Sequence, residues 1–83
     1  MKILYFAWVK MKVGIAEEDV TVPEGVTDVA GLIAWLCART PRHAAAFADL
    51  SIIRAAVDQE YVPFHHPVDS AREVAFFPPV TGG

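Results

Sequence analysis

The sequence has few of the residues that several protein classes require. Cys37 is the single cysteine among 83 residues, whereas domains this small in oxidising compartments usually carry several disulfides, so we expect a reducing cytoplasm. Seven Lys and Arg residues stand against ten Asp and Glu residues, for a net charge of -3, and we therefore expect no nucleic-acid partner. No apolar run approaches the roughly 20 residues of a membrane span, so we expect no membrane partner.

Metal-binding and catalytic side-chain patterns are also lacking. His43, His65 and His66 fit no usual zinc spacing and have no cysteine nearby in sequence, so we interpret them as loop histidines. The acidic residues 17–19 are interpreted as a solvated entry to a strand rather than as paired catalytic carboxylates. Cys37 is interpreted as a partly buried structural thiol. The sequence thus predicts neither a metal nor a cofactor bound by this chain.

The sequence does contain enough apolar side chains for one packed core. Hydrophobic residues make up 54% of the chain and charged residues 20%, a balance typical of a globular protein. A chain of this length cannot divide its apolar residues between two stable cores. We therefore expect a single domain over residues 1–77, followed by a flexible Gly-Gly tail over residues 78–83.

Two strands are predicted near the N-terminus. Residues 3–9 are β-branched, aromatic or otherwise apolar throughout, which favours a central strand buried on both faces. Residues 10–16 include Gly14 and are predicted to form a turn. Residues 18–22 are predicted to form a second strand, which Pro23 ends. Together these segments predict an antiparallel hairpin.

Two helices are predicted in the middle of the chain. Thr27 is placed to cap the first helix, because its hydroxyl can accept a hydrogen bond from a first-turn amide. Thr40 followed by Pro41 repeats this start signal for a second, shorter helix through residues 44–48. The apolar stripe that predicts the first helix consists of Val29, Leu32, Ile33 and Leu36.

Further strands are predicted over residues 52–57, 61–62 and 73–77. Pro78 and Pro79 must end the last one, because proline cannot donate a ladder hydrogen bond. Parallel pairing of the first and last strands would use the two most apolar segments. The sequence therefore predicts an α+β fold of the β-grasp (ubiquitin-like) type, a mixed sheet of about five strands with one main helix and one short helix.

The last six residues indicate where the chemistry lies. Pro78 and Pro79 hold the exit from the sheet extended, whereas Gly82 and Gly83 have no Cβ and can enter a channel too narrow for other residues. The reactive group of such a tail is the α-carboxylate of Gly83, which ATP must activate in a partner enzyme because this chain has no phosphate-binding loop. Taken alone, a Gly-Gly ending is more typical of a frayed terminus without a role than of a reactive tail.

The run EVAFFPPVTGG over residues 73–83 resembles the C-terminal signature of the molybdopterin synthase small subunit family, which are ubiquitin-like sulfur carriers. Residues 3–7 (ILYFA) and 55–62 (AAVDQEYV) are similar to the same family in matching order. The resemblance implies that a separate adenylating enzyme uses ATP to activate Gly83. It also implies that a persulfide donor then supplies the sulfur of a C-terminal thiocarboxylate.

The resemblance further implies how the sulfur is used. The tail would enter the large synthase subunit, where the thiocarboxylate attacks the cyclic pterin precursor to build the dithiolene of molybdopterin, the ligand of the molybdenum cofactor. Two loaded carriers are needed per product, and a heterotetramer of two small and two large subunits is implied. The acid, base and pterin-binding groups are expected on the large subunit, so this chain by itself is a sulfur-donating subunit. The inserted residues would be Pro78, Pro79, Val80, Thr81 and Gly82.

The resemblance also implies a docking surface. By position in the family, Phe6, Tyr61 and Phe77 would lie on the exposed face of the sheet, with Lys10 as a charged contact. The alternation expected of the predicted strands agrees, and an exposed apolar patch usually marks a partner site. The residues expected to share this face are Leu4, Phe6 and Trp8 in the first strand and Ala75 and Phe77 in the last.

Two other functions stay open. A sulfur carrier of the thiamine pathway would share the fold, the Gly-Gly end and the thiocarboxylate, and only residues 76–79 favour the molybdopterin branch. A ubiquitin-like modifier or a pure binding module would instead be conjugated to lysines or act through contacts alone. The modifier predicts isopeptide-linked species in cells.

Overall fold

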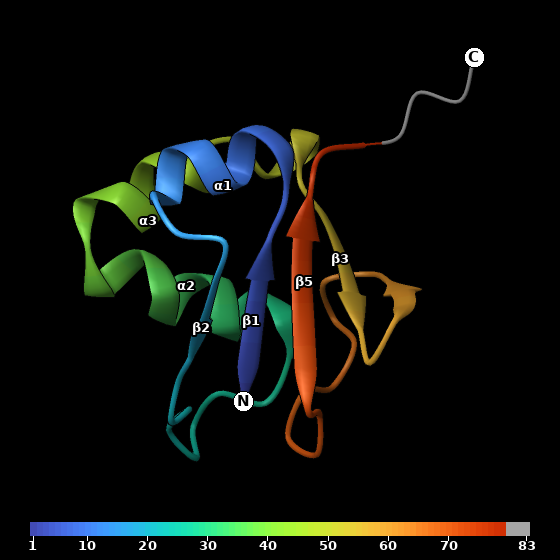
Figure 1. Cartoon of the computed structure of the whole chain (residues 1–83). Helices are drawn as coiled ribbons and strands as arrows, with labels where there is room; N and C mark the ends of the chain where they lie inside the picture. Colours follow the sequence, from blue (N-terminus) through green and yellow to red (C-terminus); the bar gives the residue numbers. More distant parts are fainter. Residues whose placement is uncertain (80–83) are drawn as a thin grey trace.

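The computed structural model describes residues 1–79, and the last four residues of the predicted tail, Val80, Thr81, Gly82 and Gly83, lie outside the described part. Two strands and a helix open the chain, three helical segments follow, and three strands close it, and the helices lie behind and above a single sheet (Figure 1). The strands are β1 (Lys2–Tyr5), β2 (Glu17–Asp19), β3 (Arg54–Val57), β4 (Glu60–Val62) and β5 (Glu73–Phe77). The helices are α1 (Ala7–Val13), α2 (Val29–Arg39), α3 (Pro41–Ala46) and the 3-10 helix η1 (Leu50–Ile52).

The sheet is mixed and has the order β2-β1-β5-β3-β4. Strands β1 and β5 pair in parallel at its centre, from Lys2 opposite Glu73 to Tyr5 opposite Phe76. The other neighbouring strands pair antiparallel. The predicted β-grasp arrangement and the parallel pairing of the first and last strands are thus confirmed, and so are the bounds of the last strand.

Helix α2 covers one face of this sheet (Figure 1). Its predicted apolar stripe is confirmed, because all of its members are buried in the core. The predicted N-cap is wrong by one residue: Asp28, and not Thr27, accepts the hydrogen bond from the amide of Gly31, at 2.7 Å. Asp is as good a cap as Thr, and the packing of Val29 and Leu32 onto the sheet sets the start.

The predicted first strand is too long. Strand β1 ends at Tyr5, and the residues from Ala7 to Val13 form helix α1, so the chain has a third α-helix that was not predicted. Ala7 turns the chain with a φ of 53°. A short apolar run does not distinguish a buried strand from a buried helix. A helix forms here instead of a strand because Val9 and Val13, one helical turn apart, are then both buried in the core.

The end of α1 is fixed by Gly14, which follows it directly, and by Arg42, which is distant in the sequence. Gly14 adopts a φ of 95° and its amide donates to the carbonyl of Lys10, at 2.8 Å. The guanidinium of Arg42 on α3 donates to the carbonyls of Lys12 and Val13, at 3.1 and 3.0 Å, and its Nη2 to that of Met11, at 3.2 Å. Arg42 thereby satisfies carbonyls that a helix end leaves without partners, and it joins α1 to α3.

The remaining predicted bounds differ by a few residues. The predicted strand over residues 18–22 is only Glu17–Asp19. Of the predicted strand over residues 52–57, Ile52 belongs to η1 and β3 begins only at Arg54. Strand β4 begins at Glu60, one residue before the predicted strand. The predicted start of the short helix is confirmed, since Thr40 caps α3 and Pro41 is its first residue.

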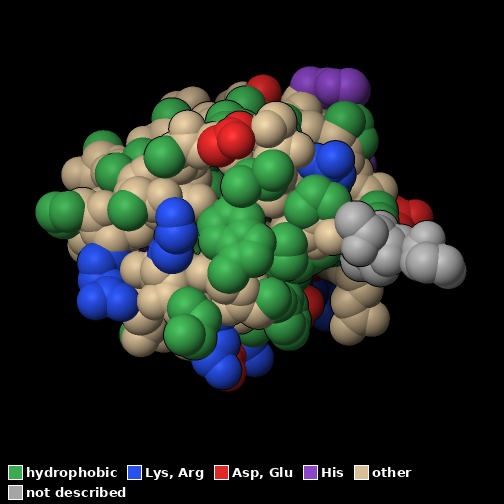
Figure 2. Space-filling view, turned by 90° about the horizontal axis from the view of Figure 1, so that it is seen from above, with side chains coloured by type: hydrophobic (Ala, Val, Ile, Leu, Met, Phe, Trp, Pro, Cys, Tyr) green, Lys and Arg blue, Asp and Glu red, His purple; other side chains and the backbone are tan. Residues whose placement is uncertain are grey.

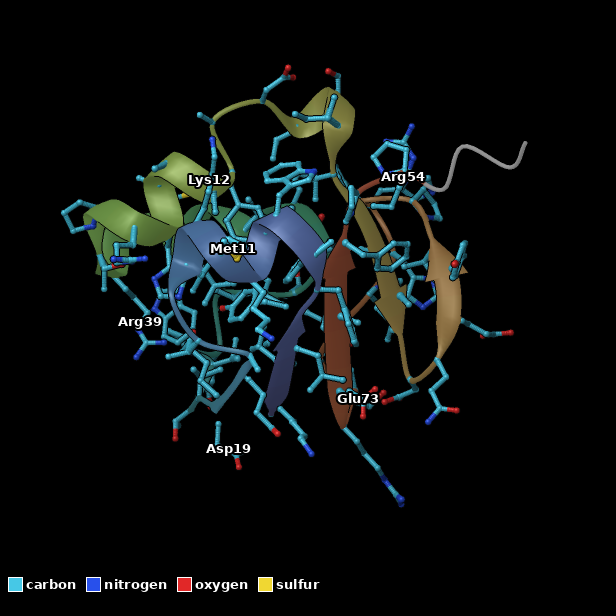
Figure 3. The ribbon with its side chains drawn as sticks, turned by 45° about the horizontal axis from the view of Figure 1, so that its top comes forward. Met11, Lys12, Asp19, Arg39, Arg54 and Glu73 are labelled. Atoms are coloured by element: carbon cyan, nitrogen blue, oxygen red, sulfur yellow. The ribbon has the colours of Figure 1, made fainter. Side chains whose placement is uncertain are left out.

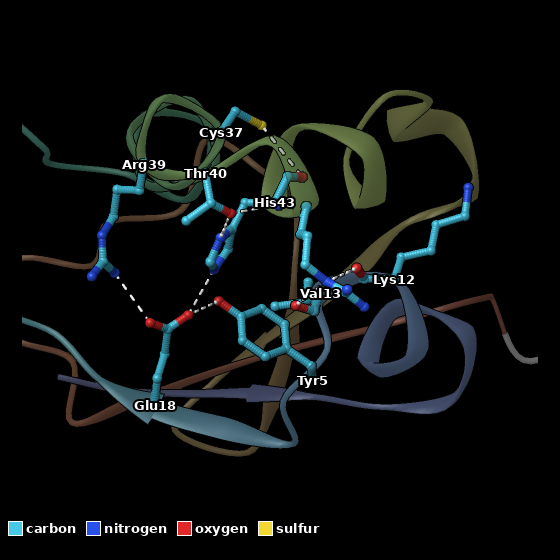
Figure 4. A network of polar contacts seen from close by, with 9 residues as sticks. Tyr5, Lys12, Val13, Glu18, Cys37, Arg39, Thr40 and His43 are labelled. Atoms are coloured by element: carbon cyan, nitrogen blue, oxygen red, sulfur yellow. Dashed lines mark hydrogen bonds and ion pairs between the residues drawn. The ribbon is translucent and has the colours of Figure 1, made fainter.

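A carboxylate inside the fold joins β2 to three other elements (Figure 4). The Oε2 atom of Glu18 accepts a hydrogen bond from the hydroxyl of Tyr5, at 2.7 Å, and lies 2.7 Å from Nε2 of His43, while Oε1 lies 3.2 Å from Arg39. His43 is only 5% exposed, and its Nδ1 lies 2.6 Å from the hydroxyl of Thr40. An ionised carboxylate can only accept, so Nε2 of His43 donates to Glu18.

This network corrects two interpretations of the sequence. Glu18 is not a solvated residue at a strand entry, and His43 is a buried residue of α3 and not a loop histidine. Both errors have the same cause, because the contacting residues lie 13 to 25 positions apart along the chain. Burial raises the pKa of Glu18, but hydrogen bonds from Tyr5 and His43 and the charges of His43 and Arg39 outweigh it and lower the pKa below its ordinary value. Burial and Glu18 together raise the pKa of Tyr5.

We expect the charge of Glu18 to stabilise the fold in a pH-dependent way. Glu18→Gln should lower the free energy of unfolding by about 1–2 kcal/mol at pH 7, because charge-assisted hydrogen bonds become neutral ones. The pKa of Glu18 is lowered in the folded state, so its contribution is complete above the unfolded pKa of about 4.3 and is lost as the pH falls through the folded pKa. Denaturant unfolding of both proteins across this range measures the difference, and a difference that persists unchanged at about pH 2 would contradict the assignment.

Candidate functional site

The face of the sheet that points away from α2 carries an apolar row. Strand register places Leu4 opposite Ala75, Ala75 opposite Ala56, and Ala56 opposite Tyr61, so the row crosses four strands. None of the four belongs to the main core cluster, which takes the alternate residues of β1, β3 and β5. In Figure 1 the helix α2 lies on the other side of the sheet. In the part of the chain that the structure describes, this open face is therefore an apolar surface with no helix packed on it.

Two of the predicted docking residues meet on the open face. The rings of Tyr61 on β4 and Phe77 at the end of β5 lie 5.0 Å apart, centre to centre, and Tyr61 is 74% exposed. Arg54, the first residue of β3, is paired with Phe77 across the ladder and is exposed. Aromatic side chains and Arg are enriched at the centres of protein interfaces, and here Tyr61 is exposed and Phe77 is partly exposed.

The other two predicted docking residues lie on α1 or at its start. Phe6 is the N-cap residue of α1, its amide donates to the carbonyl of Phe76 at 3.1 Å, and its side chain is 48% exposed. Lys10 is exposed on α1. The predicted alternation along a first strand is wrong for Phe6 and Trp8, because β1 ends before both of them. The hydrogen bond to Phe76 nevertheless places Phe6 beside the end of β5.

Parallel pairing explains why these residues share one edge with the base of the tail. The carboxyl ends of β1 and β5 lie at the same edge of the sheet, so the chain enters α1 and leaves β5 side by side (Figure 1). Pro78 and Pro79, both half-buried, follow β5 directly at this edge. The structure thus brings together the described predicted site residues: Phe6, Lys10, Phe77, Pro78 and Pro79, with Tyr61 against Phe77.

The same edge carries both apolar and charged side chains. Figure 2 looks down on it and shows hydrophobic side chains gathered at its centre, with several Lys and Arg side chains around them and Asp or Glu side chains above them in the view. Met11 and Lys12 on α1 lie at this end, and so does Arg54 (Figure 3). The acidic residues Asp19 and Glu73 lie at the other end (Figure 3). We call this end of the molecule the tail edge, an apolar surface with several Lys and Arg side chains at its border.

Cys37 on α2 shows no feature of a nucleophile. Its thiol is half-buried and Sγ lies 4.0 Å from the carbonyl of His43. Burial raises the pKa of the Cys37 thiol, so the thiolate is disfavoured at neutral pH. Among residues 1–79, no group of three His, Cys, Asp or Glu side chains could hold a metal ion, and no helix is long and apolar enough to cross a membrane.

The sequence patterns do not predict the contribution of α1 to the tail edge. Met11 is exposed there on a helix, and not in the predicted turn over residues 10–16. A signal for the helix was present: Val9 and Val13 are one helical turn apart, and Gly14 follows at the position that favours a left-handed C-cap. The reactive end proposed from the sequence, Gly82 and Gly83, lies outside the described residues.

Comparisons with known proteins agree with this geometry. A family model described as "ThiS family" matches residues 3–83. The chain is 41% identical over its whole length to the curated molybdopterin synthase sulfur carrier subunit of Escherichia coli (strain K12), of which it covers 99%. A solved structure from Pyrococcus furiosus, a putative molybdopterin converting factor, subunit 1, matches with a TM-score of 0.74 and 30% identity over 95% of both chains.

A second solved structure extends the likeness of the fold. SAMP1 from Haloferax volcanii matches with a TM-score of 0.73 over 100% of this chain and 98% of its own, at 23% identity, which shows the shared fold. The family model covers nearly the entire sequence, and the curated relative aligns from end to end. This chain therefore belongs to the ThiS family.

Proposed function

We propose that this chain is the sulfur carrier of molybdopterin synthesis, whose C-terminal Gly83 is converted to a thiocarboxylate and delivers its sulfur inside a large synthase subunit. One structural observation supports this most strongly. The segment that leads to the Gly-Gly end leaves the sheet at the edge where exposed aromatic side chains gather. A partner that binds this edge also receives the tail. The 41% identity to a curated sulfur carrier subunit supports the same function.

The chemistry would use the main chain of Gly83 and not a side chain. In an activating enzyme, the carboxylate oxygen attacks the α-phosphorus of ATP and pyrophosphate leaves, which gives an acyl adenylate. The terminal sulfur of a persulfide donor then attacks the acyl carbon and displaces AMP. Reductive cleavage of the resulting sulfur–sulfur bond by a thiol leaves the thiocarboxylate. Glycine is the least hindered residue for both attacks, because it has no Cβ.

The body of the domain would direct this acyl group to its partner. Tyr61 and Phe77 offer apolar area that docking removes from water, while Phe6 and Lys10 extend the contact at the start of α1. Pro78 and Pro79 restrict the backbone between this surface and the reactive end. The large subunit would supply the groups that bind the pterin precursor and move its protons. A reducing compartment such as the cytoplasm suits a persulfide donor and the free thiol of Cys37.

The first test measures the mass of the intact chain. Incubation with an activating enzyme, ATP and a sulfur source should raise the mass by the difference between one sulfur and one oxygen atom, located at Gly83 by fragmentation. A relative that the enzyme loads serves as the positive control. An unchanged mass beside a loaded control would overturn the proposed function.

A matched variant tests whether the reaction needs the terminal residue. Deletion of Gly83 should abolish both the mass change and product formation with the large subunit. The thermal unfolding of the variant should match that of the full chain, because the core residues all lie between Ile3 and Phe76. Product formation by the shortened chain would show that the tail mechanism is wrong.

A third test concerns the aromatic pair. Tyr61→Ala should weaken binding to the large subunit about tenfold or more, because exposed aromatic side chains dominate such interfaces. The free energy of unfolding should fall by no more than about 1 kcal/mol, since Tyr61 mainly gives up its contact with Phe77. Titration calorimetry measures the affinity. Glu60→Ala, on the other side of the same strand, is the control, and equal affinities for the two variants would remove Tyr61 from the docking surface.

A further inference from the structure

Helix α1 has an inward and an outward face. Val9 and Val13 are buried in the core, whereas Met11 and Lys12 are exposed on the outward side. Trp8, at i−3 from Met11 and i−4 from Lys12, is half-buried and lies between the core and this outward side. Met11 is 75% exposed, a large apolar surface for a solvated position. A methionine side chain is unbranched and adapts its shape to a partner, which is why such residues recur in binding surfaces.

The outward face of α1 also carries positive charge. The ammonium group of Lys12 lies 5.6 Å from the centre of the Trp8 ring, in a cation–π contact, and Lys10 is exposed on the same helix. The Lys and Arg side chains that form ion pairs among residues 1–79 are Lys2 and Arg39. The two lysines of α1 are thus placed to meet carboxylates of another molecule.

Continuity and area connect this face with the proposed docking surface. Phe6 begins α1 and is bonded through its amide to the end of β5, so the exposed apolar surface runs from the sheet onto the helix. A stable complex buries about 800 Å² on each partner, roughly a sixth of the 5009 Å² that this chain exposes. The centre of the open face adds little to this area, because Ala56 and Ala75 are each only 7% exposed. The interface must therefore extend over neighbouring surface.

We propose that the outward face of α1, formed by Trp8, Met11 and Lys12, is the second half of the docking surface, and that the large subunit covers it with an apolar recess bordered by carboxylates. The inference rests on the proposed function, since it names the surface through which the carrier binds its partner. Met11 fills the recess, and Lys10 and Lys12 face its acidic border. The Tyr61–Phe77 pair and α1 then bind on either side of the point where the tail leaves the domain.

The test compares two charge insertions in the full-length chain. Met11→Glu should raise the dissociation constant for the large subunit of the same organism about tenfold or more, because it buries a charge where an apolar side chain was. Ala34→Glu, at an exposed position of α2 on the far side of the sheet, should change it less than about twofold. Circular dichroism and thermal unfolding establish that both variants fold.

A second variant tests the charge. Lys12→Glu should also weaken binding, and the loss should shrink as the salt concentration rises from about 0.05 to 0.5 M, because salt screens charge pairs at the border of an interface. If Met11→Glu and Lys12→Glu bind as tightly as the unmodified chain, α1 is not part of the interface and the inference is wrong. If the unmodified chain itself fails to bind the large subunit, the proposed function is wrong. The two failures are thus distinguishable.

Discussion

The parallel ladder between β1 and β5 is the constraint on which the rest of the molecule depends. Parallel strands have their carboxyl ends at the same edge, so pairing the first strand with the last places the entrance to α1 beside the exit of the chain. The four paired positions use the most apolar strands, and Ile3, Tyr5, Val74 and Phe76 all point into the core. Burial of these residues therefore fixes the direction in which the tail leaves the domain.

The second constraint holds the helices against this ladder. Arg42 binds the carbonyl end of α1, and Glu18 gathers Tyr5, Arg39 and His43 into one network. Both devices are polar and both join segments that are distant in sequence. They act where apolar packing alone would leave helix ends and side chains without hydrogen-bond partners. As a result, α1 is held at the tail edge, where its outward face adds apolar area and positive charge to the surface around Phe77.

The residues that stabilise the fold are not the ones that carry the proposed chemistry. The residues with unusual environments, Glu18 and His43, stabilise the body, whereas the proposed reactive group is a main-chain carboxylate at Gly83. On the proposed function, activation and transfer would take place in partner enzymes, so the carrier would need little catalytic apparatus of its own. The folded domain has to offer a surface that the partner binds, and it has to direct the unhindered C-terminal glycine toward that partner. The tail edge, with its exposed Phe6, Met11 and Tyr61, meets the first need.

The amino-acid sequence by itself determined the elements whose signals are local: the stripe of α2, the cap and proline that start α3, the last strand before Pro78, and the Gly-Gly end. It also determined the parallel pairing, because only two segments were apolar enough for the centre of the sheet. Tertiary structure decided whether residues 7–13 form a strand or a helix. A short apolar run is compatible with either element, and only its packing against the core selects one. It also decided the partners of Glu18 and the position of Met11, because these depend on contacts between residues far apart in the chain, which no local pattern contains.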